Sequence, residues 1–471
     1  MTSGSDDLRR HPSVEREQVL ARDLGARHQA MLAIGGAIGT GLFLGSGLSV
    51  GVAGPAVAVS YLLMAGLSVL LAGALTEMCV AHPTAGSFGV YAEMYVSPFA
   101  GYLVRLSYWL MQIVSTGGHM VAVAVYMRYW FPDPPGVVWV ASFSVLLVLA
   151  NAGAVRTYAE AEYWLVMIKV VAVVAFVLLG FGLLAGLTGD APIGLGNYAG
   201  HGGFMPAGLT GIWIASCFAL YSFIGVEVVA VTSGEAKDPA VTIPKAMVRM
   251  VLGLSAMYLA TVIVLVGVIP WNQTGVSESP FVTVLSRSGI PGAGAVMNFV
   301  VLTAALSAAN ANLYLVARTL FSLARAGYVP ATLGAVNSRG TPLNALLTST
   351  LGLAGAMLVQ WAWPESAYVG FLGVALFGGL LVWWMIFVTH IRFRAAWARS
   401  GQPLPFRSPF GIPGSILGAV GLMTVLATTW WAPGLKVTLL AAGPWLVVVG
   451  AGYVVSSRAR TQKFKGTGHA R

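Results

Sequence analysis

Long apolar segments alternate with short polar connections along almost the whole chain. A helix that crosses a bilayer needs about 20 mostly apolar residues. By this criterion the pattern predicts about twelve membrane spans and an all-α integral membrane protein. The predicted spans are residues 29–50, 54–78, 98–128, 136–152, 159–187, 206–233, 244–269, 291–325, 342–361, 366–391, 413–431 and 437–457.

The polar ends of the chain divide it into three parts. Residues 1–28 form a tail of mixed charge, residues 29–457 a single transmembrane domain, and residues 458–471 a basic tail. The first tail lacks the short apolar core and the small-residue cleavage site of a signal peptide. We therefore expect the first apolar segment to be a retained membrane helix.

Composition and charge support the membrane interpretation. Hydrophobic residues make up 57% of the chain and charged residues only 9%, whereas soluble domains carry about 25% charged residues. The net charge of +10 does not indicate a nucleic-acid partner, because the basic residues lie in the tails and in short loops. Basic segments face the cytoplasm in membrane proteins. The charge pattern thus predicts a multi-pass protein of the cytoplasmic membrane with both termini inside.

Several kinds of chemistry are not supported by the sequence. Cys79 and Cys217 both lie in apolar segments, without the spacing of a disulfide framework or a metal site. We find no paired catalytic constellation and no glycine-rich loop that would hold a phosphate. We therefore expect no metal, no cofactor and no ATP-driven step. A secondary transporter is the favoured class, and a membrane enzyme or a channel is the alternative.

Two predicted helices are interrupted by glycine. The first contains residues 35–43 (GGAIGTGLF), and the sixth contains residues 221–227 (YSFIGVE). A close helix–helix contact is one explanation for such glycines. Interrupted helices at matching positions of two repeats, however, are the best sequence sign of a transporter site. The repeats would be residues 29–187 and 206–391, followed by two further helices at 413–457.

An interrupted helix offers backbone groups to both ends of an amino acid. The N–H groups from Gly39 to Gly41, at the positive end of a half-helix, suit a carboxylate. Freed carbonyl groups near Ala37 and Ile224 suit an ammonium group. The predicted site therefore binds a small amphoteric solute, and its partners are that solute, a coupling ion and the lipid bilayer.

A set of motifs carries a family resemblance over about residues 25–460. They are Gly39 to Phe43, Pro83 to Phe88, Glu162 to Trp164, Ile168 to Val171, Ser222 to Glu227, Gly234 to Pro239, Ile243 to Lys245, Ala317-Arg318 and Leu323 to Gly327. Together they resemble the bacterial amino acid permeases of the amino acid–polyamine–organocation superfamily. The resemblance implies a five-plus-five inverted repeat and alternating access. It also implies that substrate lies between helices one, three, six, eight and ten.

The resemblance also assigns roles to residues of the site. Thr40 and Gly41 would bind the substrate carboxylate through a hydroxyl and an amide, and the carbonyls of Ala37 and Ile224 would receive the ammonium. Tyr221 matches an aromatic residue that closes over substrate in some relatives. The candidate substrate-binding residues are Ala37, Gly39, Thr40, Gly41, Ser115, His119, Tyr221, Ser222 and Ile224.

His119 departs from the family pattern, because many relatives carry a carboxylate at this point of the third helix. The candidate residues Ser115, Thr116 and Ser222 also offer no anion to a cationic side chain. A neutral amino acid is therefore the expected substrate, with a cationic or aromatic amino acid as the alternative. A purely structural role, in which His119 packs between helices, agrees equally well with the sequence.

Lys169 and Glu227 lie within predicted spans. Inserting a charged side chain at the centre of a membrane helix costs about 2.5–3.5 kcal/mol, so such a residue suggests a function. For each residue, a structural hydrogen bond or ion pair is the alternative. In similar permeases a lysine on helix five takes the place of bound sodium. In this chain the corresponding site would be formed by the carbonyls near Gly35 and Ile38 and by the hydroxyl of Ser307. We therefore expect proton symport, with Glu227 handling a proton or a gate. Exchange of one amino acid for another is the alternative transport mechanism.

Three further charged residues lie nearer the ends of predicted spans: Glu77, Arg105 and Arg318. Long basic side chains near helix ends commonly extend to the membrane surface. We expect these residues either to reach the surface in this way or to form ion pairs.

Overall fold

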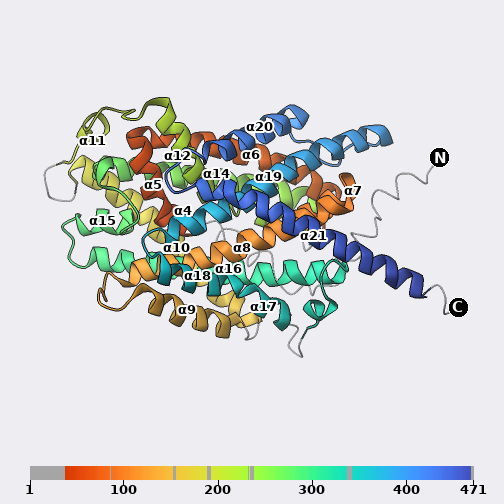
Figure 1. Cartoon of the computed structure of the whole chain (residues 1–471). Helices are drawn as coiled ribbons and strands as arrows, with labels where there is room; N and C mark the ends of the chain where they lie inside the picture. Colours follow the sequence, from red (N-terminus) through yellow and green to blue (C-terminus); the bar gives the residue numbers. More distant parts are fainter. Residues whose placement is uncertain are drawn as a thin grey trace.

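The structure is a computed structural model that describes residues 38–84, 86–151, 155–187, 192–231, 233, 238–336 and 342–467. Within 155–162 and 459–467 it describes the backbone only. In these ranges the regular elements are all helices, without a strand. The prediction of an all-α protein is confirmed. The long helices run roughly side by side along one axis (Figure 1).

The helices follow the apolar segments of the sequence. The longer ones are α5 (Gly45–Ala53), α6 (Val57–Ala81), α7 (Ser87–Tyr95), α8 (Pro98–Met127), α9 (Gly136–Asn151), α10 (Val155–Ala185), α12 (Gly208–Phe223), α14 (Pro239–Val268), α16 (Ala293–Arg325), α18 (Leu351–Ala362), α19 (Ala367–Ser400), α20 (Gly411–Thr428) and α21 (Lys436–Thr467). The short ones are α4 (Thr40–Phe43), α11 (Gly196–Ala199), α13 (Val228–Val231), α15 (Pro280–Ser286) and α17 (Leu343–Ser349).

In the described part of the chain, ten helical stretches are long and apolar enough to cross a membrane, and α9 is a shorter apolar helix. One of the ten, Gly45–Ala81, contains a 3₁₀ turn at Gly54–Ala56 between α5 and α6. Gly54 has a φ of +62°, which glycine adopts readily. This turn falls at the start of the second predicted span, residues 54–78, and the total of twelve stays a prediction.

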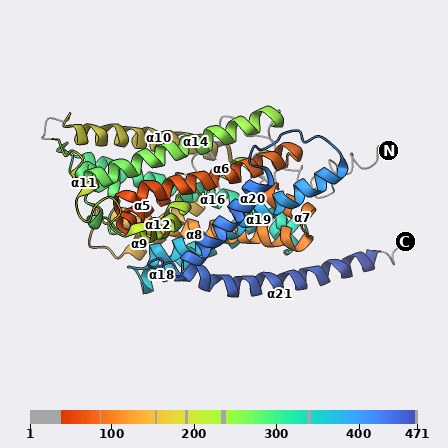
Figure 2. The ribbon, with the colours of Figure 1, turned by 90° about the horizontal axis from the view of Figure 1, so that it is seen from above.

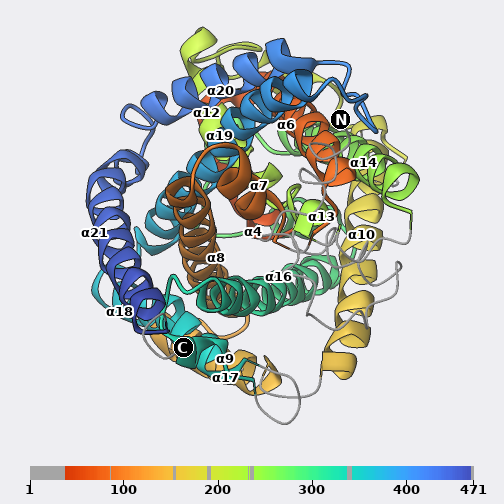
Figure 3. The same ribbon diagram turned by 90° about the vertical axis from the view of Figure 1, so that its right-hand side faces the viewer.

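The short helices α4 and α13 lie in the middle of the molecule. Viewed along the helix axes, α6, α8, α10, α16 and α19 surround them, and α9, α17, α18, α20 and α21 lie farther out (Figure 3). In a second view, α10 and α14 run along one edge and α21 along the opposite edge (Figure 2). The helix interruptions are therefore enclosed by full-length helices, which shield their free backbone groups from lipid.

Charged residues near helix ends join neighbouring helices, as expected for Glu77 and Arg105. The fully buried Glu77 carboxylate accepts hydrogen bonds from Arg394 Nε at 2.7 Å, from Arg394 Nη2 at 2.6 Å and from the Ser408 amide at 2.8 Å. Arg105 pairs with Glu93 at 2.7 Å. The first cluster fixes α6 against α19 and the connection to α20. Such pairing offsets the cost of burying a charge.

Candidate functional site

The sixth predicted span is interrupted after Phe223, where α12 ends. Ile224 has an extended conformation with a ψ of 128°, and Gly225 has a φ of +117°. L side chains rarely adopt this φ, so glycine allows the chain to leave the helix here. Helix α13 begins only at Val228. The break separates two helical pieces within one predicted span.

The described part of the first predicted span begins with a non-helical stretch at Ile38 and Gly39, which we call the first interruption. Gly39 is extended, and α4 begins at Thr40. The Gly39 carbonyl accepts the amides of Leu42 and Phe43 at 3.2 and 3.3 Å. The first N–H groups of a helix have no partners within it and attract negative groups. The start of α4 therefore suits an anionic ligand group.

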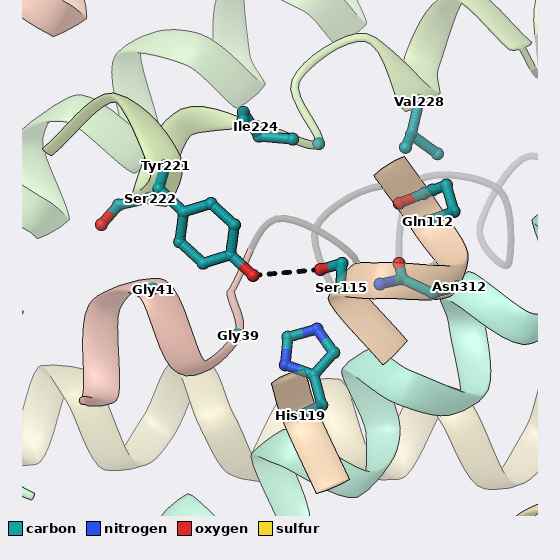
Figure 4. Close-up of a pocket in the computed structure, with 11 residues that line it drawn as sticks. Gly39, Gly41, Gln112, Ser115, His119, Tyr221, Ser222, Ile224, Val228 and Asn312 are labelled. Atoms are coloured by element: carbon teal, nitrogen blue, oxygen red, sulfur yellow. Dashed lines mark hydrogen bonds between the residues drawn. The ribbon is translucent and has the colours of Figure 1, made fainter. Parts of the chain in front are cut away.

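The two interruptions face one another across a cavity (Figure 4). The cavity volume is about 30 Å³. The lining residues come from the first interruption, α8, the second interruption with α13, and α16. They are Gly39, Gly41, Gln112, Ser115, His119, Tyr221, Ser222, Ile224, Gly225, Val228 and Asn312.

Hydrogen bonds from α8 connect it to both interrupted helices. Ser115 Oγ lies 3.1 Å from Tyr221 Oη, a contact drawn as a dashed line in Figure 4. His119 Nδ1 lies 2.9 Å from Thr40 Oγ1. One face of α8 therefore positions polar groups from both interruptions around the same cavity.

Glycine at position 41 allows the backbones of the two interruptions to approach each other. A Cβ atom added to Gly41 would lie 3.1 Å from Ser222 Cα and 3.1 Å from Tyr221 Cδ1. Real Cβ atoms seldom make contacts this short. At Gly39 an added Cβ would lie 3.1 Å from His119 Cε1 and 3.3 Å from Ala308 Cβ. Larger residues at either position would therefore reshape the cavity.

Two buried charged residues lie beside the interruptions, outside the cavity lining. Lys169 of α10 is fully buried, and its Nζ donates to the Ile38 carbonyl at 3.2 Å. Glu227 is also fully buried, and its Oε2 accepts the Gly225 amide at 2.9 Å and Trp383 Nε1–H at 3.1 Å. Glu227 Oε1 has no hydrogen-bond partner among the described residues. A buried oxygen without a partner is costly, so the hydrogen bonding of this carboxyl group is incomplete.

The structure brings together most of the candidates from the sequence. Seven of them line the cavity: Gly39, Gly41, Ser115, His119, Tyr221, Ser222 and Ile224. Thr40 contacts His119 from behind the lining. Ser307 is buried on α16, and its neighbour Ala308 faces Gly39. Ala37 lies outside the described residues.

Sequence reasoning missed three lining residues, Gln112, Val228 and Asn312. Gln112 lies three residues before Ser115 on α8 and therefore on the same helix face. An amide side chain within an apolar span is the signal that could have identified Gln112, and it applies equally to Asn312 on α16. Val228 gives no such signal, because valine is common throughout these spans.

These features define a multi-spanning membrane protein in which non-helical stretches of two predicted spans meet at a polar cavity. Residues 28–465 match the family described as amino acid permease. The chain therefore belongs to the amino acid permease family, as its motifs predict.

Similar proteins cover nearly the whole chain. It is 33% identical over 441 residues to the probable threonine/serine transporter YbxG of Bacillus subtilis, covering 93% of this chain and 95% of that protein. It is 34% identical over 439 residues to the aromatic amino acid transport protein AroP of Escherichia coli K12, covering 93% and 96%. The family and these relatives are transporters rather than enzymes, so the prediction that this membrane protein is not an enzyme is confirmed.

Proposed function

We propose that this permease imports a neutral amino acid by alternating access and that a proton gradient drives it. The observation that carries the proposal is the meeting of two interrupted helices at one cavity. Their backbone groups complement the carboxylate and the ammonium that all amino acids share. In this proposal residues 29–187 and 206–391 are inverted repeats within one domain, and the helices at 413–457 lie outside the repeats.

The substrate carboxylate binds at the start of α4, to the Gly41 amide and the Thr40 hydroxyl. The substrate ammonium binds the carbonyls of Ala37 and Ile224. Support comes from the geometry: α4 begins at Thr40, and Ile224 is non-helical and lines the cavity. Tyr221, bonded to Ser115, closes the cavity over the bound substrate.

The substrate side chain is neutral and small. The described lining residues include the amides of Gln112 and Asn312 and two serine hydroxyls, but no carboxylate. Glu227 is turned toward Gly225 and Trp383 instead. Polar groups of this kind satisfy a hydroxyl side chain, whereas a cation would lack a counter-charge. Threonine and serine, named for YbxG, therefore fit better than the aromatic amino acids named for AroP.

Coupling uses the proton rather than sodium. The Lys169 ammonium lies against the Ile38 carbonyl, where a cation stabilises the first interruption. A sodium ion beside this ammonium would be repelled strongly in a medium of low dielectric constant. Glu227, with one unpaired oxygen beside the second interruption, is the candidate proton carrier and gate.

Purified protein in proteoliposomes tests this function. Labelled threonine should accumulate when an inward proton gradient is imposed in sodium-free buffer. Unlabelled serine should compete better than phenylalanine, histidine or arginine. Stronger competition by arginine than by serine would contradict the neutral site.

Both termini lie in the cytoplasm in this account, which follows from the lysine and arginine residues of the tails at residues 1–28 and 458–471. Neither natural cysteine is exposed, since Cys79 and Cys217 are both buried. An impermeant thiol reagent should therefore leave R10C and K465C unlabelled in intact cells and label both after lysis. Labelling of either variant in intact cells would show that this terminus lies outside the cell and would contradict the proposed topology.

A further inference from the structure

A second cavity lies on the outside of the bundle, between α10 and α14. The two helices touch near one end, where a Cβ added to Gly180 would lie 2.1 Å from Val264 Cγ1. They separate toward the other end, where a Cβ added to Gly253 would meet nothing within 4 Å. The resulting groove has a volume of about 410 Å³. Its walls include Val174, Val177 and Leu178 of α10 and Leu254 and Met257 of α14.

The wide end of this groove carries positive charge. Arg249 lines the groove, and Lys245 lies one helical turn away on the same face of α14. Both residues are exposed. Neither has a hydrogen bond or ion pair within the part of the chain that the structure describes. The groove thus combines an apolar channel with two available cations at one end.

The inner wall of the groove reaches the first helix interruption. Ile38 is fully buried and is one of the residues that line the groove. Its carbonyl oxygen accepts the hydrogen bond from Lys169. A molecule in the groove would therefore pack directly against the residue that positions this ammonium.

We propose that the groove binds an anionic phospholipid of the bilayer, with one acyl chain between α10 and α14 and the phosphate on Arg249 and Lys245. From Arg249 to Ala260 the groove extends for about 16 Å at 1.5 Å per residue, which matches much of an acyl chain. Basic residues beside a membrane groove favour anionic headgroups. The bound chain holds Ile38 in place and so supports the first interruption during transport.

A second apolar groove provides a matched comparison. It lies between α6 and α20, and its lining includes Leu63, Gly66 and Leu417 but no charged residue. A Cβ added to Gly66 would also meet nothing within 4 Å. Phenylalanine at Gly66 or at Gly253 can therefore fill its own groove without clashing at the Cβ position. Only the Gly253 groove touches Ile38.

Native mass spectrometry of the purified protein, incubated with phosphatidylglycerol or phosphatidylcholine, measures lipid retention directly. The wild-type protein should retain phosphatidylglycerol preferentially. The double variant K245Q/R249Q should lose roughly thirtyfold in retention, because each cation near a membrane surface strengthens anionic binding roughly fivefold. G253F should lose the lipid as well, whereas G66F should keep it. Equal retention of both lipids, or unchanged retention by K245Q/R249Q and G253F, would overturn the proposal.

Uptake rates in liposomes with and without phosphatidylglycerol measure the effect of the lipid on transport. The wild-type protein and G66F should transport faster with phosphatidylglycerol, and G253F should not respond to it. A wild-type rate that does not depend on phosphatidylglycerol would contradict the supporting role of the lipid. Lipid retention does not require transport, so an error in the proposed substrate or coupling ion would leave the mass-spectrometry result unchanged.

Discussion

The ammonium of Lys169 donates a hydrogen bond of 3.2 Å to the carbonyl oxygen of Ile38, 131 positions earlier in the chain. The lysine is fully buried on α10, and Ile38 immediately precedes the extended Gly39. The contact places a fixed positive charge at the interruption of the first helix. The interruption is thus stabilised by a protein side chain, and the account of coupling depends on this contact.

Lys169→Ala should abolish accumulation of amino acid against a gradient. The variant removes the cation at the Ile38 carbonyl and leaves a buried acceptor without its donor, which costs about 1–3 kcal/mol. Uptake into proteoliposomes under a proton gradient measures the effect. Lys436→Ala is a matched control, because Lys436 is exposed and its ammonium lies over the Trp430 ring, 5.3 Å from the ring centre. Normal accumulation by a well-folded Lys169→Ala protein would remove the lysine from the mechanism.

Gly41→Val should weaken substrate binding at least about fivefold, because overpacking of a tight site costs about 1–3 kcal/mol. The added Cβ would already crowd Tyr221 and Ser222, and the branched side chain would obstruct the start of α4. Scintillation proximity binding with labelled threonine measures the loss. Gly443→Val is the control, since a Cβ at Gly443 meets nothing within 4 Å. Unchanged affinity in Gly41→Val would place the site elsewhere.

Glu227→Gln should flatten the pH dependence of uptake. Glutamine keeps an oxygen that can accept the Gly225 amide and Trp383 Nε1–H, but it cannot release a proton. Initial rates of uptake across a series of external pH values provide the measurement. Glu278→Gln serves as the control, because Glu278 is exposed and outside the candidate membrane spans. If Glu227→Gln retained the wild-type pH profile, the acid would have a structural role only.

The sequence predicted the helical fold well because the length of an apolar segment is a direct physical requirement of the bilayer. It also located the interruption of the sixth predicted span, because glycine at position 225 is unusual within a helix. Other features depend on tertiary contacts. Helix α19 continues to Ser400, past the predicted end at 391, because arginine and alanine residues extend it beyond the apolar segment.

The polar lining of the cavity was only partly predictable. Ser115 and His119 follow a recognisable motif, whereas Gln112 and Asn312 lie on helices far apart in the sequence and meet only in the folded molecule. The position of Glu227 behind the lining is likewise set by Trp383, which lies 156 positions later. Sequence patterns identify unusual residues, but the packing of the helices determines which of these residues share a cavity.

The most direct test of the central claim is labelled threonine uptake by wild-type proteoliposomes under two separate gradients. An inward proton gradient in sodium-free buffer should drive accumulation above the external concentration. An inward sodium gradient, with the proton gradient collapsed by an ionophore, should give no more than equilibration. Accumulation driven by sodium alone would contradict the account, because the Lys169 ammonium would then not replace the ion.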